Sequence, residues 1–164
     1  MQKYDDKCMQ QAFIVAKESK CTRLQVGMTI SIDGRVVTDS YNGLPEGADD
    51  AEVEFRCPDC DVYTNNPDIV PPKVCPTCQG YGVITNPEVQ HAERNGFDFC
   101  AAKGIAIEGA TIHITHAPCI ECAKSIISTR IARVVYANTY RKTDGIDYLK
   151  KHNVEVEQWK PEQN

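Results

Sequence analysis

Residues 117–124 read Ala-Pro-Cys-Ile-Glu-Cys-Ala-Lys, and residues 91–93 before them read His-Ala-Glu. The spacing of Cys119 and Cys122 lets two sulfur atoms reach one ion from a single turn of the chain. With His91 they offer one imidazole nitrogen and two thiolates, which are donors that zinc prefers. Both segments are expected to begin helices, where the helix dipole favours thiolates. Because a catalytic zinc has three protein ligands and one position open for water, these segments predict a metal site that performs chemistry.

Glu93 follows the histidine closely and is the candidate proton carrier. Bound zinc lowers the pKa of its water from about 15.7 to about 7, so hydroxide is available near neutral pH. Glu93 would take the proton of this water and return protons to a ring nitrogen and a leaving amine. The net reaction would replace an exocyclic amine by a carbonyl and release ammonia. A purely structural zinc site is the alternative. Catalysis is favoured because the two motifs occur together in this order and offer only three evident ligands.

A second set of cysteines forms two Cys-Pro-x-Cys pairs, at positions Cys57, Cys60, Cys75 and Cys78. This spacing is typical of a zinc ribbon, in which four thiolates close a tetrahedral structural site. A rubredoxin-like iron site and four free thiols are the alternatives. Since this part of the chain is rich in proline and can bury little apolar surface, metal binding is expected to hold it folded. We interpret residues 51–87 as a zinc-ribbon-like insertion within a single domain of residues 1–164.

Composition limits the classes of partner. The chain has 164 residues and a formal net charge of −5, which disfavours capture of a nucleic acid backbone and favours a small nucleotide held by local groups. No apolar run is long enough for a membrane-spanning helix, and the first residues lack the features of a secretory signal. We therefore expect a cytoplasmic protein without a membrane partner. Its nine cysteines then indicate metal sites rather than disulfides.

Hydrophobic periodicity predicts helices over residues 4–20, 90–103, 119–129 and 144–151. In the first of these helices, Met9 and Phe13 are expected on the buried face. Strands are expected over residues 25–32, 35–41, 110–115, 133–137 and 154–156. Asp33-Gly34 would form a two-residue hairpin turn, and Gly104 would end the second helix. The alternation of strand and helix in the second half predicts parallel strands with helices on the faces of the sheet.

Further stretches accompany the two metal-binding segments: Glu18-Ser19-Lys20-Cys21 with Val26-Gly27, Tyr41-Asn42-Gly43-x-Pro45-x-Gly47, Asn95 after His91-Ala92-Glu93, and Val134-Val135-Tyr136 with Tyr140. Together with the H-x-E…P-C-x-x-C signature of zinc deaminases, they resemble the deoxycytidylate (dCMP) deaminase family. The Tyr-Asn-Gly loop distinguishes this family from tRNA adenosine deaminases and from free cytidine deaminases. The resemblance implies an α/β fold, the cytidine-deaminase-like three-layer α/β/α sandwich with a mixed five-stranded sheet, here with the inserted zinc-ribbon segment.

The resemblance implies zinc-dependent hydrolysis of dCMP to dUMP and ammonia, which feeds dTMP synthesis. A deaminase acting on dCTP, alone or as well as dCMP, is the main alternative, because the same arginines would serve either substrate. A nucleic-acid base deaminase is disfavoured by the net charge and the acidic insertion. A non-catalytic zinc-ribbon interaction module is disfavoured by the presence of Glu93. The resemblance also implies a homohexamer, with dCTP and dTTP as effectors and magnesium on the bound triphosphate.

Substrate contacts are implied residue by residue. Asn42 matches the family asparagine near the sugar and base, and the Ala117 carbonyl would accept a hydrogen bond from the substrate amine. Ala92 belongs to the same substrate-binding set, and Tyr140 matches a tyrosine near the phosphate. Arg23, in the loop before the first strand, is a candidate phosphate ligand because guanidinium binds phosphate bidentately. The alternatives are a solvated charge for Arg23, a turn residue for Asn42, and edge packing for Tyr140.

Two positions depart from relatives of this family. Cys21 resembles a second-zinc ligand of some members, but the cysteine expected after the Tyr-Asn-Gly loop is missing. The four cysteines of the insertion are therefore expected to replace that site. Ala102 and Lys103 stand where regulated relatives are expected to have an arginine.

Overall fold

The computed structural model describes residues 3–48, 52–60, 74–139 and 143–161. Along the chain, its elements are α1 (Asp5–Ala16), β1 (Gly27–Ile32), β2 (Arg35–Tyr41), β3 (Glu54–Arg56), β4 (Val83–Thr85), α3 (Ala92–Lys103), β5 (Thr111–His116), α4 (Ile120–Ser128), β6 (Arg133–Asn138), α5 (Asp144–Lys151) and β7 (Glu155–Gln158). None of the helices in these described ranges is long and apolar enough to cross a membrane.

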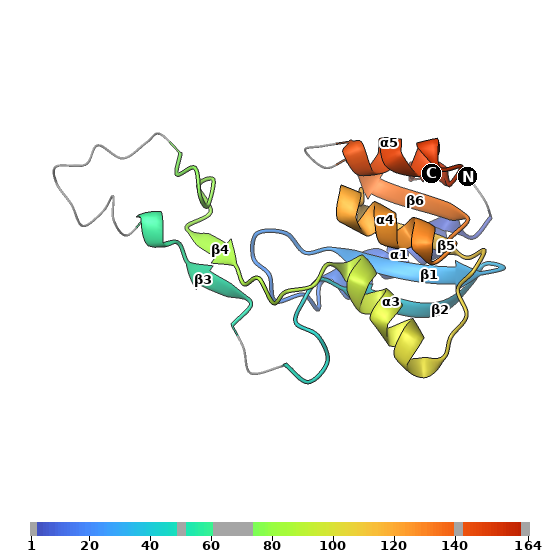
Figure 1. The fold of residues 1–164 in the computed structure, drawn as a ribbon, viewed down its shortest axis with the longest axis horizontal. Coiled ribbons are helices and arrows are strands. Elements are labelled where there is room, and N and C mark those ends of the chain that lie inside the picture. Colours follow the sequence, from blue (N-terminus) through green and yellow to red (C-terminus); the bar gives the residue numbers. More distant parts are fainter. Residues whose placement is uncertain (1–2, 49–51, 61–73, 140–142, 162–164) are drawn as a thin grey trace.

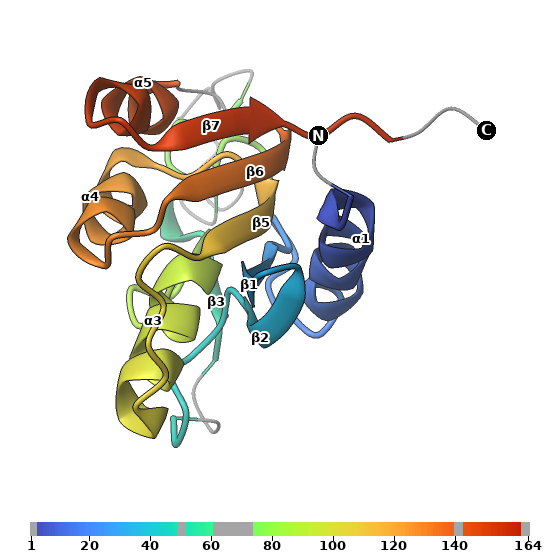
Figure 2. The ribbon, with the colours of Figure 1, turned by 90° about the vertical axis from the view of Figure 1, so that its right-hand side faces the viewer.

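Five strands form the central sheet in the order β2-β1-β5-β6-β7. The pairs β1–β2 and β1–β5 are antiparallel, whereas β5–β6 and β6–β7 are parallel. Helix α1 covers one face, and α3, α4 and α5 cover the other (Figures 1 and 2). The expected α/β/α sandwich with a mixed five-stranded sheet is therefore confirmed.

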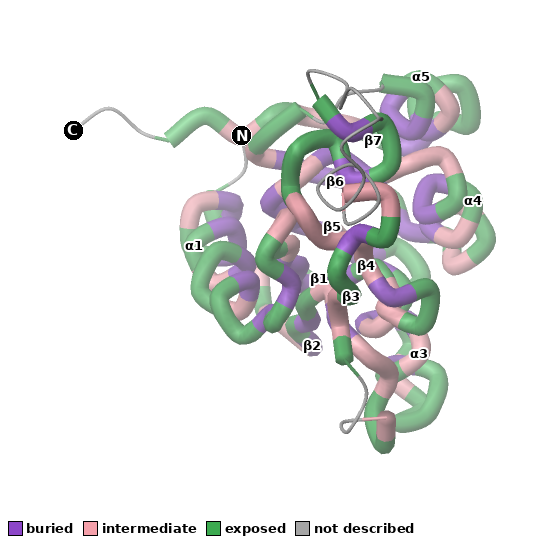
Figure 3. The backbone as a smooth tube through the Cα atoms, turned by 90° about the vertical axis from the view of Figure 1, so that its left-hand side faces the viewer, coloured by how far each residue is buried: buried purple, intermediate pink, exposed green. Residues whose placement is uncertain are grey.

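The core lies where the helices face the sheet, and the buried positions gather there (Figure 3). Its largest fully buried side chains include Met28, Ile30, Ile112, Ile114 and Val134. They alternate along β1, β5 and β6, as expected for strands whose two faces contact different helices. Burial of this apolar surface is the main force that holds the helices on the sheet.

Local turn chemistry agrees with the prediction. Asp33 and Gly34 have positive φ values of 50° and 73°, as a type I′ hairpin turn requires. Gly104 ends α3 with a φ of 66° in the left-handed region, which costs glycine little. The bounds of β2 and α5 agree with the sequence, and α1 ends at Ala16 rather than extending to residue 20.

Helix α1 lies directly against β1, and its exposed face differs from the one that the sequence predicts. A Cβ atom on Gly27 would lie 2.0 Å from the carbonyl oxygen of Ala12, so the helix and β1 touch through their backbones. Met9 is buried as predicted, but Phe13 was placed wrongly because it is 36% exposed. Its ring packs against Trp159, which follows β7, with the ring centroids 6.0 Å apart. The tail beyond the last strand therefore covers part of a helix surface that sequence periodicity assigns to the core.

The segment after β2 contains a short hairpin that sequence patterning did not indicate. Strands β3 and β4 pair antiparallel, with Phe55 opposite Ile84, in a separate two-stranded sheet. This hairpin projects from the end of the main sheet (Figure 1). Each strand has only three residues, which is too short for hydrophobic alternation to reveal.

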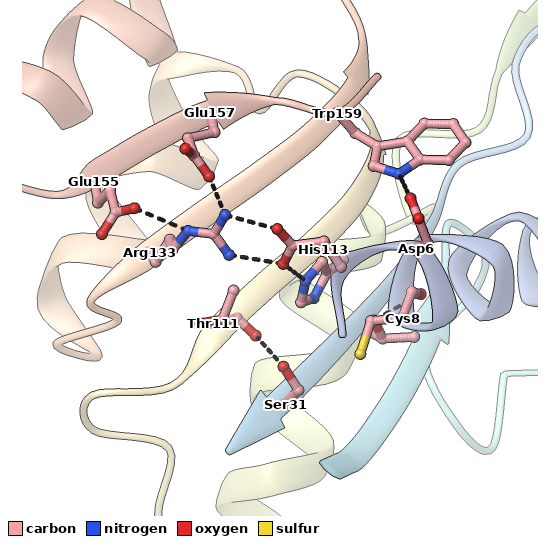
Figure 4. Close-up of polar contacts among 11 residues, drawn as sticks. Asp6, Cys8, Ser31, Thr111, His113, Arg133, Glu155, Glu157 and Trp159 are labelled. Atoms are coloured by element: carbon pink, nitrogen blue, oxygen red, sulfur yellow. Dashed lines mark hydrogen bonds and ion pairs between the residues drawn. The ribbon is translucent and has the colours of Figure 1, made fainter. Parts of the chain in front are cut away.

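A buried ionic cluster connects α1 to the far strands (Figure 4). Arg133 on β6 donates to both carboxylate oxygens of Asp5, at 2.8 and 2.9 Å, and both residues are 2% exposed. Arg133 also pairs with Glu155 at 3.0 Å and with Glu157, both on β7. The Nε2 atom of His113 lies 2.9 Å from Asp5. Buried charges are tolerated here because they are paired and hydrogen-bonded on several sides.

Removing the Asp5 carboxylate should therefore destabilise the protein strongly, because Arg133 would lose its bidentate partner inside the core. We expect Asp5→Ala to lower the free energy of unfolding by about 3 kcal/mol or more. The matched control is Glu108→Ala, which breaks an exposed pair with Arg130 and should cost under about 1 kcal/mol. Denaturant unfolding of the two variants measures the difference. Equal and small losses would show that the buried cluster is not a stabilising connection.

Candidate active site

A cavity of about 450 Å³ lies at the carboxyl end of β5, beside the starts of α3 and α4. Open α/β sheets commonly bind ligands at this end of parallel strands. The volume falls within the range of about 300–1,000 Å³ found for small-molecule sites. Its lining comprises Cys21, Arg23, Leu24, Val26, Asn42, Tyr81, Thr85, Val89, His91, Ala92, Glu93, His116, Ala117, Cys119 and Thr139.

The predicted ligands of a catalytic metal come together at this cavity. His91 and Cys119 are the N-cap residues of α3 and α4, and both have extended backbone. The Nδ1 atom of His91 lies 3.3 Å from the sulfur of Cys122 and 3.7 Å from that of Cys119. Tetrahedral zinc with bonds of about 2.0–2.3 Å separates its ligand atoms by about 3.5–3.8 Å. The nature and spacing of the three donors therefore fit a single zinc ion.

Electrostatics already favour thiolate at this point. Hydrogen bonds with Cys122 and His91 lower the pKa of Cys119 to about 3. The same contact with Cys119 raises the pKa of His91, while the hydrogen bond to Cys119 raises the pKa of Cys122. The three side chains thus share protons around one thiolate, and a bound cation would displace those protons.

Glu93 lies in the first turn of α3 and lines the same cavity. Its side chain is buried, with an exposed fraction of 3%. Burial raises the pKa of this carboxyl group, because desolvation disfavours its charged form. A carboxyl group that exchanges its proton closer to neutral pH is suited to proton transfer.

Close contacts fix the starts of the two helices. Ser40 on β2 donates to the carbonyl oxygen of Ala92 at 2.8 Å, and a Cβ atom on Gly96 would lie 2.8 Å from the Ser40 hydroxyl. A Cβ atom on Gly145 of α5 would lie 2.1 Å from the carbonyl oxygen of Pro118. Glycine at these two positions therefore lets α3 approach β2 and lets α5 press against the start of α4.

Asn42 lines the cavity, and its side chain also braces the neighbouring loop. Its Oδ1 atom accepts from the Val26 amide at 2.7 Å, and its Nδ2 atom donates to the Leu24 carbonyl at 2.9 Å. The side-chain amide of Asn95, on α3, donates to the carbonyl oxygens of Tyr41 and Gly43, the two neighbours of Asn42 in the chain. The Tyr-Asn-Gly loop is thereby tied both to the loop before β1 and to the helix that carries His91 and Glu93.

Of the other residues predicted to bind substrate, three line the cavity and one lies outside the described part of the chain. Ala92 and Ala117 line the cavity, and the Ala117 amide donates to Asn138 at 2.8 Å. Arg23 also lines it, and its guanidinium lies over the ring of Tyr81, 5.1 Å from the ring centroid. Tyr140 lies outside the described residues.

Sequence reasoning missed several residues of the cavity wall. His116 ends β5, directly before Ala117, and burial lowers its pKa. Its position at the carboxyl end of a predicted strand was a signal that could have identified it. Tyr81 and Thr85 come from the segment around β4, and no local pattern predicts that this segment reaches the cavity. Cys21 is buried in the wall, but it does not join either group of candidate metal ligands among the described residues.

The second group of cysteines also comes together. The sulfur atoms of Cys57, Cys60, Cys75 and Cys78 all lie within 4.8 Å of one another. The sulfur atoms of Cys57 and Cys75 are 3.8 Å apart, and those of Cys60 and Cys78 are 3.4 Å apart. The Gly82 amide donates to the Cys78 sulfur at 3.3 Å. Four thiol groups at this spacing fit a closed tetrahedral site.

Comparisons with known proteins agree with this arrangement. The profile of the cytidine and deoxycytidylate deaminase zinc-binding region matches residues 2–138. The deoxycytidylate deaminase of Enterobacteria phage T4 is 32% identical, over 90% of this chain and 86% of the phage protein. The protein of phage T2 with the same name is 31% identical, over 90% of this chain and 88% of its own.

Solved structures give the same result. The dCMP deaminase from the cyanophage S-TIM5 in complex with dCMP and dUMP is 30% identical, with a TM-score of 0.75. The match covers 97% of this chain and 99% of the cyanophage chain. Because the family profile matches residues 2–138, which is most of the chain, this chain belongs to the cytidine and deoxycytidylate deaminase family.

Proposed function

We propose that the protein is a zinc-dependent dCMP deaminase, which converts dCMP and water to dUMP and ammonia and so supplies the precursor of dTMP. The observation that carries this proposal is the convergence of His91, Cys119 and Cys122 at a cavity that the buried Glu93 also lines. The phage relatives are named for deoxycytidylate, and the cyanophage enzyme was crystallised with dCMP and dUMP. The alternative of dCTP as substrate has no support in these relatives.

In the proposed mechanism, His91, Cys119 and Cys122 would hold the zinc ion. When bound, this ion would lower the pKa of a water molecule and polarise it toward the amino-bearing carbon of the ring. Glu93 would carry two protons in turn. Its carboxylate takes the first from the water and delivers it to the ring nitrogen, while the water oxygen bonds to the ring carbon. It then takes the second proton from the hydroxyl group so formed and gives it to the departing amine, which leaves as ammonia. The raised pKa of Glu93 suits both the accepting and the donating step.

The substrate would be oriented by the residues that surround these groups. The Ala117 carbonyl would accept a hydrogen bond from the amine, and Ala92 would contact the base. The side-chain amide of Asn42 uses one hydrogen in its bond to Leu24, and the second would be available to the sugar. Arg23 would bind the phosphate, and Tyr140 is assigned there by position in the family motif. The limited volume of the cavity and the net charge of −5 favour a nucleotide over a nucleic acid polymer.

The four-cysteine group is proposed as a structural zinc site that holds residues 51–87 folded as an insertion within the deaminase domain of residues 1–164. The closed set of four sulfur atoms supports this role over a catalytic one. Family membership alone supports a homohexamer in the cytoplasm, with dCTP and dTTP as effectors and magnesium on a bound triphosphate.

Glu93→Gln should retain zinc and bind substrate but lose nearly all turnover, because an amide cannot shuttle the proton. The loss should be about 100-fold or greater, in the range expected for general acid–base catalysis. Ammonia release from dCMP, dCTP and deoxycytidine measures it, with dCMP as the preferred substrate of the wild-type protein. Substantial residual activity would show that another group carries the proton, and a wild-type protein inert toward all three would reject the function.

Metal content tests the assignment of two zinc sites. The wild-type protein should contain two zinc ions per chain, and Cys119→Ala should lose the catalytic ion alone, since the other four thiolates form an independent site. Cys75→Ser should instead lose the ion of the insertion and become less stable, because metal binding contributes directly to folding. Elemental analysis of purified protein measures both. Iron in the insertion, or two zinc ions retained in Cys75→Ser, would contradict the assignment.

A further inference from the structure

The turn after Cys78 and strand β4, which follows it, reach the active-site cavity. Tyr81, just before β4, and Thr85, the last residue of β4, line that cavity together with Arg23. On β3, the carboxylate of Glu54 accepts hydrogen bonds from the backbone amides of Thr22 and Arg23, at 2.9 and 3.0 Å. It also accepts from the hydroxyl group of Thr22. The hairpin is therefore attached to the same loop that supplies Arg23.

Arg23 is held against an aromatic ring at the wall of the cavity. Its guanidinium carbon lies 5.1 Å from the ring centroid of Tyr81, within the distance of about 6 Å at which cation–π attraction operates. Among the described residues that line the cavity, Arg23 is the single lysine or arginine. An unrestrained arginine side chain loses considerable rotamer freedom when it binds a ligand. The ring of Tyr81 restricts that freedom before the ligand arrives.

The position of Tyr81 is set by the cysteine cluster. The Tyr81 amide donates to the carbonyl oxygen of Cys78 at 3.1 Å, and the next amide, of Gly82, donates to the Cys78 sulfur. The Gly82 carbonyl in turn accepts from the Cys57 amide at 2.9 Å. Gly80 and Gly82 have φ values of 90° and 75°, so the turn that presents Tyr81 requires glycine on both sides.

We propose that the turn after Cys78 and strand β4 form a wall of the nucleotide site, in which Tyr81 positions Arg23 to bind the 5′-phosphate of the substrate. The inference rests on the proposed function and adds to it a positioning residue and a role for the four-cysteine site. Tyr81 acts through Arg23, because its ring attracts the guanidinium and leaves the N–H groups of that plane available to phosphate. Metal binding at the four cysteines would keep the turn that carries Tyr81 in place.

The test compares binding of dUMP with binding of deoxyuridine by calorimetry, since neither product is turned over. Tyr81→Ala should weaken dUMP binding by about 2-fold to 30-fold, the range expected for loss of a cation–π contact, and leave deoxyuridine binding unchanged. Tyr81→Phe should restore dUMP binding, because the ring rather than the hydroxyl group holds Arg23. The double variant with Arg23→Ala should bind dUMP no more weakly than Arg23→Ala alone.

Phe55→Ala is the matched control, because Phe55 is another exposed aromatic residue of the hairpin but does not line the cavity. It should bind both products as the wild-type protein does. Equal weakening of dUMP and deoxyuridine binding in Tyr81→Ala, additive losses in the double variant, or no loss at all would overturn the inference.

Turnover of dCMP by the wild-type protein distinguishes failure of this inference from failure of the proposed function. If it occurs while Tyr81→Ala binds dUMP normally, only this inference fails. If the wild-type protein neither deaminates dCMP nor binds dUMP, the proposed function fails and the inference with it.

Discussion

The three candidate metal ligands must be brought together from two helices, and the surrounding structure depends on this constraint. His91 begins α3 and Cys119 begins α4, so the two helix starts have to meet beside the end of β5. Glycine at positions 96 and 145 permits the close approaches that bring them there, because a Cβ atom at either place would collide with β2 or with Pro118. The parallel crossover β5-α4-β6 then sets the direction of the second helix. The sandwich can therefore be understood as the frame that holds these two helix starts together.

Two buried carboxylates show how the same fold separates stability from chemistry. Asp5 is paired with Arg133 and lies within hydrogen-bond distance of His113, so its charge is compensated on the face covered by α1. Glu93 lies on the opposite face of the sheet, where burial raises its pKa, as suits the proton transfer proposed for it. Ion pairs hold the Asp5 carboxylate in its charged form, whereas no ion pair among the described residues fixes the protonation state of the Glu93 carboxyl group. The segment around β4 adds a third function, because it contributes Tyr81 to the wall of the cavity.

Features set by short-range spacing were predictable from sequence, whereas those set by long-range packing were not. The grouping of His91, Cys119 and Cys122 was predictable because the residues belong to short motifs with fixed spacing. The turn at Asp33-Gly34 was predictable because it needs particular backbone angles. Phe13 was misplaced because Trp159, far along the chain, packs against it. The contact of Tyr81 with Arg23 depends on how a distant segment folds back over a loop, and no local pattern encodes it. The second role of Asn42, as a brace for the loop before β1, was likewise visible only in three dimensions.

The most direct test of the central claim is the fate of oxygen from water during turnover. Zinc-loaded protein would be incubated with dCMP in water enriched in heavy oxygen, and the nucleotide product would be analysed by mass spectrometry. Hydrolytic deamination predicts dUMP that carries one heavy oxygen atom at the carbon that bore the amine, with one ammonia released for each dUMP formed. Recovery of unchanged dCMP from the zinc-loaded protein, or dUMP without the heavy oxygen, would contradict the claim.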